Sequence, residues 1–359
     1  MIPNHLERIY TELQRSPYPV FIWGAGSMSE EIISRLEERG ISYAGRFITT
    51  ETENSHIIPS DEVIFSLKEL EMQYEKINVV AGHGHYEKIT DLKPYSFINK
   101  VYVIPNPYLQ YKGPDLEYVC QNQDRLNEII EQLADVESQQ ALERYIAVSI
   151  TNDISYLLYP NICVDGMFGL KELNITDSES FVDVGAWEGD TISRFLKCTD
   201  NKFRKIFAFE PDPNIFKVLH NRYGNHENIS LYHCGLGERN GELCIGRENT
   251  QSAFLTSADC SPASEKIPIK TLDDVLAEET VSLLKISVPF MFLDILKGSR
   301  NLLQKNRPRL IINVAADDRF LLYDTVKWIT DLNLPYKLVL RFDFPMPTRL
   351  CLYAYPATL

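Results

Sequence analysis

Glycines and acids at the ends of two predicted strands are the residues of this sequence best placed to bind a ligand. Apolar residues 181–184 predict a buried strand, Gly185 and Gly189 follow in a turn, and a helix is expected from Thr191. The glycines let the backbone approach a ligand closely, and a helix start leaves N–H groups unpaired. Roughly twenty residues further on, a second apolar strand ends at Glu210, where open parallel sheets place an acid on a ribose diol. The pattern predicts a site for a ribose-containing ligand.

The spacing of these residues differs from the dinucleotide pattern G-x-G-x-x-G and fits the D-x-G-x-x-x-G turn of methyltransferases that use S-adenosylmethionine. Residues 183–191 and 208–213 together resemble the FkbM family of these methyltransferases. Four more segments follow in the order of that family, at residues 233–241, 271–276, 284–288 and 307–311. The resemblance covers about residues 125–355.

The resemblance implies a class I methyltransferase fold, and the order of predicted elements agrees with it. Strands and helices alternate, which predicts a mostly parallel sheet covered on both faces. Two late strands without a helix between them indicate an antiparallel hairpin at one edge. The strands are expected at residues 181–184, 206–209, 229–232, 282–287, 309–314, 337–342 and 349–354. The helices are expected from residue 191 and at residues 213–222, 271–278, 292–303 and 319–332.

The resemblance also implies S-adenosylmethionine as the methyl donor. The turn would surround its amino-acid end, Glu210 would bind both ribose hydroxyls, and Asp190 and Thr191 would cap the following helix. Pro211 and Asp212 would border the adenine, which residues 234–236 would contact at the end of the third strand. The residues expected to bind the donor are Asp183, Gly185, Ala186, Glu188, Gly189, Asp190, Thr191, Glu210, Pro211, Asp212, Cys234 and Gly235.

The acceptor side of the sequence departs from the FkbM pattern. After Lys-Ile the family continues Asp-Val-Glu-Gly, whereas residues 287–290 are Ser-Val-Pro-Phe. Lys285 and Ser287 remain as hydrogen-bond donors, and Asp317 is the nearest carboxylate that could replace the lost base. Methyl transfer to a hydroxyl requires alignment of donor and nucleophile and removal of one proton. The expected catalytic residues are therefore Asp317, Ser287 and Lys285, with Phe290 lining an acceptor pocket.

Two functions fit these residues. The first is an S-adenosylmethionine-dependent O-methyltransferase acting on a hydroxyl of a sugar, glycan or related biosynthetic intermediate. The second is an FkbM-fold protein that binds the cofactor or a partner without transferring methyl groups, as a scaffold or regulator. The near-complete donor motif favours the first function, and the altered acceptor motif favours the second.

A separate β-α-β pattern precedes this region. Residues 20–23 predict a strand, Gly24 and Gly26 begin a turn into a helix, and residues 41–48 predict a second strand. Ser29 replaces the third glycine of the fingerprint, so tight packing and nucleotide binding both remain open. The stretch is similar to N-terminal domains of sugar acyltransferases, which favours a sugar nucleotide over NAD. The residues expected to line this second crevice are Gly24, Gly26, Ser27 and His83.

The sequence therefore predicts an α/β protein in three parts. A Rossmann-like domain covers residues 1–115, a helical connector or lid covers 116–170 with a break at 135–138, and the methyltransferase domain covers 171–359. His83 and His85 lie one residue apart, but no third ligand is close in sequence, so no metal site is expected. The sequence does not indicate an oligomeric state.

Composition limits the classes of partner. The 359 residues carry a net charge of −14, which argues against sequence-independent binding to nucleic acid. Seven scattered cysteines without a C-x-x-C pair suit a reducing compartment. No apolar run approaches the roughly 20 residues that span a bilayer, and the charged N-terminus does not resemble a signal peptide. We expect a cytoplasmic protein whose partner is a small-molecule or glycan acceptor, with a sugar nucleotide as one candidate.

Overall fold

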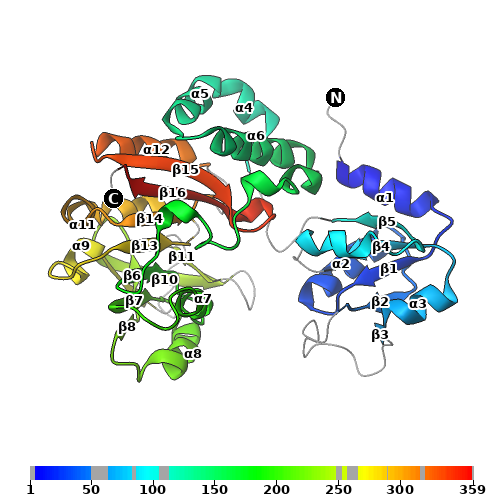
Figure 1. Ribbon diagram of the computed structural model, residues 1–359, viewed down its shortest axis with the longest axis horizontal. Helices are drawn as coiled ribbons and strands as arrows, with labels where there is room; N and C mark the ends of the chain where they lie inside the picture. Colours follow the sequence, from blue (N-terminus) through cyan, green and yellow to red (C-terminus); the bar gives the residue numbers. More distant parts are fainter. Residues whose placement is uncertain are drawn as a thin grey trace. The chain divides into compact units, whose positions relative to one another are not determined.

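The protein is described by a computed structural model that covers residues 5–49, 64–82, 86–104, 113–247, 253–256, 266–288, 290–315 and 320–357. The chain forms two compact units (Figure 1). The first comprises Met1–Leu116, Glu143–Pro160 and Pro345–Pro347. The second comprises Glu117–Leu142, Asn161–Phe344 and Thr348–Leu359. The expected boundaries at 115 and 170 stay predictions.

The first unit is built on a five-stranded parallel sheet in the order β3-β2-β1-β4-β5. Its central strands β1 and β4 are buried along their whole length and, apart from Asn78, apolar, as expected of a parallel sheet covered on both faces. The strand order reverses between β1 and β4, which is where such sheets bind ligands. The strands are β1 Val20–Trp23, β2 Gly45–Phe47, β3 Ile64–Phe65, β4 Ile77–Ala81 and β5 Ile98–Tyr102. The helices before α4 are α1 His5–Arg15, α2 Ser27–Glu38, α3 Leu67–Gln73 and η2 Tyr86–Leu92.

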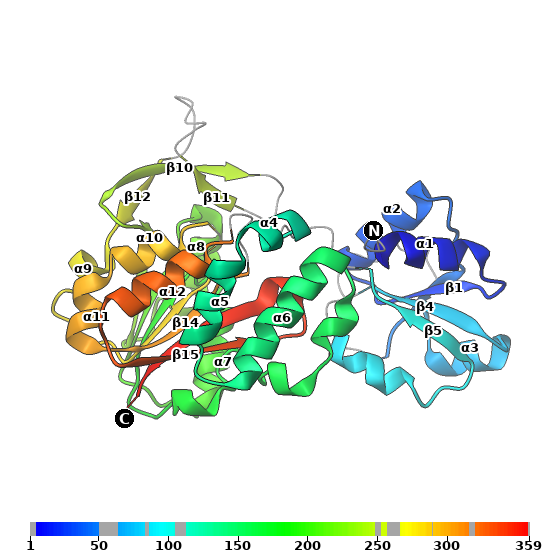
Figure 2. The ribbon, with the colours of Figure 1, turned by 90° about the horizontal axis from the view of Figure 1, so that it is seen from above.

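The predicted break in the helical region is confirmed. Helix α5 (Gln123–Gln132) follows the short α4 (Leu116–Gln121) and ends before α6 (Val136–Thr151) begins. The break is stabilised by Asp135, whose Oδ1 accepts a 2.7 Å hydrogen bond from the Ser138 amide. Figure 2 shows α5 beside α12 (Leu322–Asp331), and Tyr323 of α12 donates to Glu128 of α5 over 2.7 Å. These two helices pack together within the second unit.

The second unit contains a seven-stranded sheet in the order β15-β16-β14-β13-β6-β7-β8. Five strands are parallel, and β15 and β16 form the predicted antiparallel edge hairpin, with β16 against β14. The expected methyltransferase layout is therefore confirmed. The strands are β6 Ser180–Val184, β7 Lys205–Phe209, β8 Ile229–Tyr232, β13 Leu283–Ile286, β14 Arg309–Asn313, β15 Tyr336–Phe342 and β16 Leu350–Pro356. The helices are α7 Asp190–Cys198, α8 Pro213–Tyr223, α9 Leu272–Val275, α10 Phe292–Lys297 and α11 Arg300–Asn306.

A second, mostly antiparallel sheet was not predicted from the sequence. It has the order β11-β10-β12-β9, and its labelled strands lie together in Figure 2. Its strands are β9 Gly235–Leu236, β10 Gly241–Arg247, β11 Ala253–Thr256 and β12 Lys266–Lys270. The predicted helix 292–303 is also wrong in detail, because α10 ends at Lys297 and α11 begins at Arg300.

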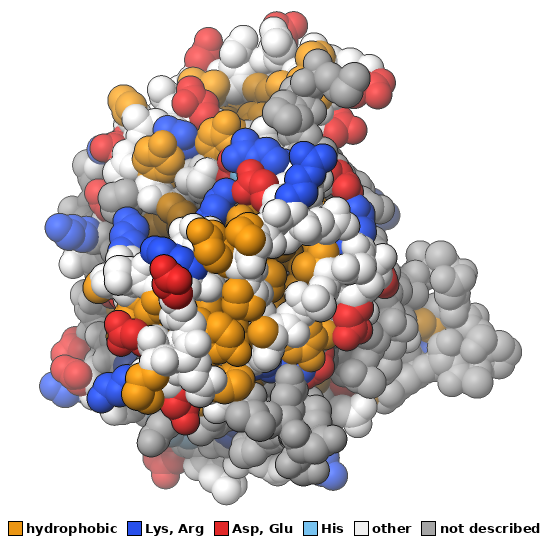
Figure 3. Space-filling model, turned by 90° about the vertical axis from the view of Figure 1, so that its right-hand side faces the viewer, with side chains coloured by type: hydrophobic (Ala, Val, Ile, Leu, Met, Phe, Trp, Pro, Cys, Tyr) orange, Lys and Arg blue, Asp and Glu red, His pale blue; other side chains and the backbone are white. Residues whose placement is uncertain are grey.

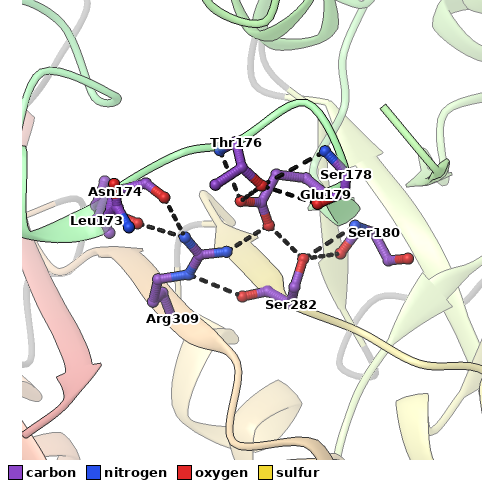
Figure 4. Close-up of polar contacts among 8 residues, drawn as sticks. All are labelled: Leu173, Asn174, Thr176, Ser178, Glu179, Ser180, Ser282 and Arg309. Carbon is purple, nitrogen blue, oxygen red and sulfur yellow. Dashed lines mark hydrogen bonds and ion pairs between the residues drawn. The ribbon is translucent and has the colours of Figure 1, made fainter. Parts of the chain in front are cut away.

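A buried polar network holds the amino ends of three central strands (Figure 4). Glu179 precedes β6, Ser282 precedes β13, and Arg309 begins β14. The Arg309 guanidinium donates to the Glu179 carboxylate and to the carbonyls of Leu173 and Asn174, and Ser282 also donates to Glu179. The network fixes the sheet at the edge opposite to the carboxyl ends of these strands.

Figure 3 shows one face of the molecule, on which hydrophobic side chains gather centrally among Lys, Arg, Asp and Glu side chains. Charges of both signs are therefore present on that face. No helix among the described residues is long and apolar enough to cross a bilayer. Within the same residues, no three His, Cys, Asp or Glu side chains cluster in a way that could hold a metal ion.

Candidate functional site

The turn after β6 requires glycine at two positions. Gly185 and Gly189 have φ angles of 73° and 86°, in the left-handed region. A Cβ on Gly185 would lie 2.6 Å from the carbonyl oxygen of Ser287, and one on Gly189 would overlap the Tyr223 ring. The amides of Gly185 and Ala186 both donate to the carbonyl of Phe209 at the end of β7, over 3.1 and 3.0 Å. The turn is thus bound to the neighbouring strand and closely packed.

The start of helix α7 differs from the expectation that Asp190 and Thr191 cap it. Gly189 occupies the N-cap position without a side-chain hydrogen bond, and Asp190 and Thr191 are the first helical residues. Asp190 is exposed and lies 3.7 Å from Arg194, whereas Thr191 is buried. The prediction failed because the left-handed glycine lets the turn enter the helix one residue earlier. No described side chain caps the first amide groups of α7.

Glu210 lies buried directly after β7, with 5% of its surface exposed. Its Oε2 accepts a 3.0 Å hydrogen bond from the Trp187 amide, and its Oε1 accepts one of 2.9 Å from the Asp212 amide. Burial raises the pKa of the Glu210 carboxyl to about 7, although the two amides act in the opposite direction. Each carboxylate oxygen has a second lone pair, so Glu210 can still accept two hydroxyl groups.

Asp212 has a local role that the sequence did not predict. Its Oδ1 accepts hydrogen bonds from the amides of Asn214 and Ile215, over 2.8 and 3.3 Å, and so caps helix α8. Pro213 follows at the first helical position, which is typical of an N-terminal cap. Because the Asp212 amide also donates to Glu210, the helix cap fixes the carboxylate that is expected to bind ribose.

Lys285 and Asp183 form a buried ion pair across strands β13 and β6. The Lys285 Nζ lies 2.7 Å from the Asp183 Oδ1, 2.8 Å from the Gly185 carbonyl and 3.2 Å from the Val184 carbonyl. These contacts use all three N–H donors of the ammonium group. Lys285 therefore positions the turn, and its direct action on an acceptor stays a prediction.

The second carboxylate oxygen of Asp183, Oδ2, is buried without a hydrogen-bond partner among the described residues. Burial raises the pKa of the Asp183 carboxyl, and the Lys285 ammonium opposes this shift. An unsatisfied buried oxygen is costly and commonly marks a place where a donor group binds.

Other residues expected around the donor have different surroundings. Glu188 is directed to the surface of α8, where it lies 2.9 Å from Arg222. The His233 ring stacks on Phe216 with centroids 4.8 Å apart, and its Nε2 lies 3.1 Å from the Pro211 carbonyl. Pro211 is thus held beside a stacked aromatic pair.

Cys234 and Gly235 were expected to end the third strand, but they lie beyond it. Strand β8 ends at Tyr232, and Gly235 begins β9, which pairs with β12 of the smaller sheet. Cys234 is buried, and burial raises the pKa of its thiol to about 11. The chain therefore leaves the main sheet before these two residues.

A small pocket lies where the carboxyl ends of β13 and β14 meet the start of β16. Its lining residues are Met167, Lys285, Ile286, Ser287, Ile311, Asn313, Arg349 and Cys351. Of the residues predicted on the acceptor side, Ser287 and Lys285 line this pocket, and Phe290 is exposed with a φ of 65°. Asp317 lies outside the described residues.

Asn313 and Arg349 were not predicted from the sequence as residues of this pocket. Asn313 ends β14, so a polar residue at the carboxyl end of a predicted strand was the available signal. Arg349 immediately precedes β16, and antiparallel pairing of Asn313 with Cys351 brings it to the same edge. That placement depends on long-range strand pairing.

In the first unit, the Gly24 turn packs closely against the end of β4. Gly24 has a φ of 126°, and a Cβ on it would lie 3.0 Å from the Gly82 carbonyl oxygen. The Ser29 hydroxyl donates to that carbonyl over 2.9 Å, so the residue that interrupts the glycine fingerprint joins α2 to the end of β4. Gly26 is the N-cap residue of α2, and Ser27 is its first helical residue. His83 lies outside the described residues, and nucleotide binding stays a prediction.

Comparison with known proteins identifies the domain that contains the donor turn. Residues 183–332 match the family model described as the methyltransferase FkbM domain. No curated protein sequence matches the chain.

A solved structure of the methyltransferase FkbM from Methylobacillus flagellatus KT is similar over 99% of this chain and 94% of that chain, with 18% identity and a TM-score of 0.62. An rRNA methylase from Streptococcus thermophilus matches 51% of this chain and 90% of its own, with 13% identity and a TM-score of 0.31. Fibrillarin from Aeropyrum pernix, in complex with S-adenosyl-L-methionine, matches 50% of this chain and 68% of its own, with 13% identity and a TM-score of 0.33. The match to the family model identifies residues 183–332 as a methyltransferase domain of the FkbM type.

Proposed function

We propose that this methyltransferase transfers a methyl group from S-adenosylmethionine to a hydroxyl group of a sugar, glycan or related biosynthetic intermediate. The observation that carries the proposal is the arrangement of Glu210, whose buried carboxylate is fixed between the amides of Trp187 and Asp212 beside the glycine turn. An acid at this place in a parallel sheet is suited to bind a ribose diol.

The residues around the turn fit a ligand with a ribose and an amino-acid group. Glu210 would accept the two ribose hydroxyls, because each of its oxygens retains a lone pair. The unused Oδ2 of Asp183 would accept from an ammonium group, and the uncapped start of α7 would face a carboxylate. When bound, S-adenosylmethionine supplies a methyl group on an activated sulfonium. Lys285 holds the turn in place through the Gly185 carbonyl.

On the acceptor side, the residues would align a hydroxyl group and accept its proton. Ser287 follows β13 and lines the pocket next to the Lys285 side chain. We assign Ser287 to orienting the acceptor hydroxyl, and Asp317 to accepting its proton. The replacement Asp317→Asn is expected to abolish turnover and to leave donor affinity unchanged.

The choice of a sugar as acceptor rests on the first unit. Its strand order reverses at Gly24, where open parallel sheets bind nucleotides. We propose a sugar nucleotide for this crevice and a cytoplasmic location for the protein. Gly26→Val is expected to block a ligand there without changing donor affinity.

The proposal is tested by calorimetric titration with S-adenosylmethionine and with S-adenosylhomocysteine. We expect micromolar affinity for both, weakened more than ten-fold, roughly, in Glu210→Ala because charge-assisted hydrogen bonds are lost. Glu227→Ala, which removes an exposed carboxylate of the same unit, is the control and should bind normally. No binding of either compound to the unaltered protein would contradict the proposal and favour a scaffold role.

A further inference from the structure

Helix α8 contacts both parts of the donor site in the proposed function. At its amino end, Asp212 caps the helix through Oδ1, and the Asp212 amide donates to the Glu210 Oε1 over 2.9 Å. At its carboxyl end, Arg222 and Tyr223 donate hydrogen bonds to the turn that precedes α7. One helix of 11 residues therefore joins the acid expected at the ribose to the turn expected at the amino-acid end of the donor.

Arg222 makes two contacts with Glu188. Its Nη1 donates to the Glu188 carbonyl over 3.0 Å, and its Nη2 donates to the Glu188 Oε2 over 2.9 Å. The two side chains are 49% and 40% exposed, and ion pairs at exposed positions add little to stability. The contact with the carbonyl fixes the peptide plane between Glu188 and Gly189, because a planar peptide cannot turn its carbonyl without turning its amide. Arg222 is thus suited to orient the turn rather than to stabilise the fold.

Tyr223 contacts the next residue of the turn. Its hydroxyl donates to the Gly189 carbonyl over 3.3 Å, and the same carbonyl accepts a 2.9 Å hydrogen bond from the Ser193 amide of α7. A Cβ on Gly189 would lie 2.3 Å from the Tyr223 ring and 3.0 Å from the Leu219 side chain. The glycine therefore lets α8 pack directly against the first turn of α7.

The first amides of α7 depend on this packing for their position. The Gly189 amide donates to the Ala186 carbonyl over 2.8 Å. No acceptor for the amides of Asp190, Thr191 and Ile192 is found in the described part of the chain. Unpaired amides at a helix start favour a negative group, such as the carboxylate of an amino acid. Their direction is set by the two turn residues that α8 holds.

We propose that Arg222 and Tyr223 are positioning residues for the amino-acid end of the donor. They hold the turn at residues 188–189, and this segment fixes the amides that would bind the donor carboxylate. The opposite end of α8 serves the ribose through Asp212 and Glu210, so the two ends of the helix act on different parts of one ligand. The inference rests on the proposed function and identifies residues that support its donor site.

The test compares two ligands of the full-length protein by calorimetric titration. S-adenosylhomocysteine has adenine, ribose and an amino-acid group, whereas 5′-methylthioadenosine has adenine, ribose and sulfur but no amino-acid group. The double variant Arg222→Met with Tyr223→Phe loses the hydrogen bonds to the turn and keeps the aromatic ring against Gly189. We expect it to bind S-adenosylhomocysteine roughly ten-fold more weakly and 5′-methylthioadenosine as tightly as the unaltered protein does.

Further measurements separate positioning from stability. The Tm of the double variant should stay close to that of the unaltered protein, because the lost ion pair is exposed. Arg222→Lys keeps the cation but loses the planar fork, and should have an intermediate affinity for S-adenosylhomocysteine. Arg204→Met is the matched control, since Arg204 is exposed and precedes β7 at the end opposite to Glu210. It should change the affinity for neither ligand.

Three results would overturn the proposal. The first is an unchanged affinity for S-adenosylhomocysteine in the double variant, and the second is an equal loss of affinity for both ligands. The third is no binding of 5′-methylthioadenosine to the unaltered protein, because the ribose would then not be held independently of the amino-acid group. All three are distinct from failure of the proposed function, in which the unaltered protein binds no S-adenosylhomocysteine.

Discussion

The amide of Trp187 donates a 3.0 Å hydrogen bond to the Oε2 of Glu210, and so joins the glycine turn to the acid at the end of the next strand. Trp187 adopts a left-handed φ of 50°, and 40% of its surface is exposed. The strained backbone directs its N–H toward the carboxylate. Any change in the protonation of Glu210 therefore acts on both the glycine turn and the acid of the proposed donor site.

Affinity for the donor should depend on pH through Glu210. Burial raises the pKa of this carboxyl to about 7, and ribose hydroxyls donate more strongly to the ionised form. We expect the affinity for S-adenosylhomocysteine to rise roughly ten-fold between pH 6 and pH 8. Glu210→Gln should bind weakly at both pH values, and calorimetry of the two proteins checks this. A pH dependence that persists in Glu210→Gln would assign the effect to another group.

The same shift makes a prediction for stability. Since the folded protein binds the Glu210 proton more tightly than the unfolded chain does, the contribution of Glu210 to the free energy of unfolding decreases as pH rises from about 4.5 to about 7. Glu210→Gln removes this contribution. Its free energy of unfolding, relative to that of the unaltered protein, should therefore be higher at pH 7.5 than at pH 5. Urea denaturation at both pH values measures this difference.

Lys285→Met should weaken donor binding as well as stability. Removing one partner of a buried ion pair costs about 3–5 kcal/mol, and the Gly185 carbonyl loses its 2.8 Å contact. The double variant Lys285→Met with Asp183→Leu leaves no buried charge and should recover much of the stability. It should still bind S-adenosylhomocysteine poorly, because the turn remains unsupported and the Asp183 carboxylate proposed to bind the ammonium group is also lost. Full recovery of affinity would show that Lys285 acts only on stability.

Local sequence signals predicted the positions of the glycine turn and of Glu210 well. The strand before Gly185 and the strand before Glu210 are short apolar runs, and their ends determine where the glycines and the acid lie. The capping of α7 was predicted wrongly, because the left-handed φ of Gly189 is not visible in the residue type alone. Strand ends are thus predictable from the sequence, whereas the dihedral angle of a turn residue is not.

Features that depend on long-range packing were missed. In β12 the apolar residues alternate with exposed ones, but Pro268 at its centre argues against a strand. The break between α10 and α11 lies at Gly298, where a Cβ would overlap the carbonyl of Gly237, the residue directly after β9. Arg349 reaches the pocket only through antiparallel pairing of β16 with β14. None of these contacts follows from residues close in sequence.

Gly189→Ala should be much more destabilising than Gly166→Ala. Both glycines have left-handed φ angles, 86° and 71°, so each alanine costs about 1–2 kcal/mol in backbone strain. A Cβ at Gly166 has no heavy atom within 4 Å, whereas one at Gly189 overlaps Tyr223 and costs roughly 1–3 kcal/mol more. Thermal unfolding of the two variants measures the difference. Equal shifts in Tm would mean that Tyr223 moves aside without cost.

Arg309→Met should destabilise the second unit more than any change at its surface. The guanidinium neutralises the buried Glu179 carboxylate and donates to two carbonyls, so its loss leaves an uncompensated charge and should cost about 3–5 kcal/mol. Burial alone would raise the pKa of Glu179, but hydrogen bonds from Arg309 and Ser282 hold it below its usual value.

The depressed pKa gives this effect a pH dependence. A carboxyl with a lowered folded pKa stabilises the fold above its unfolded pKa, and this stabilisation is lost as pH falls through the folded value. The cost of Arg309→Met, measured by urea denaturation, should therefore be largest at pH 7 and shrink below about pH 4 as Glu179 becomes protonated. The double variant Arg309→Met with Glu179→Gln is the control, because it carries no charge to neutralise. If Arg309→Met lowers the free energy of unfolding by the same amount at pH 7 and below about pH 4, the guanidinium acts through the Leu173 and Asn174 carbonyls alone.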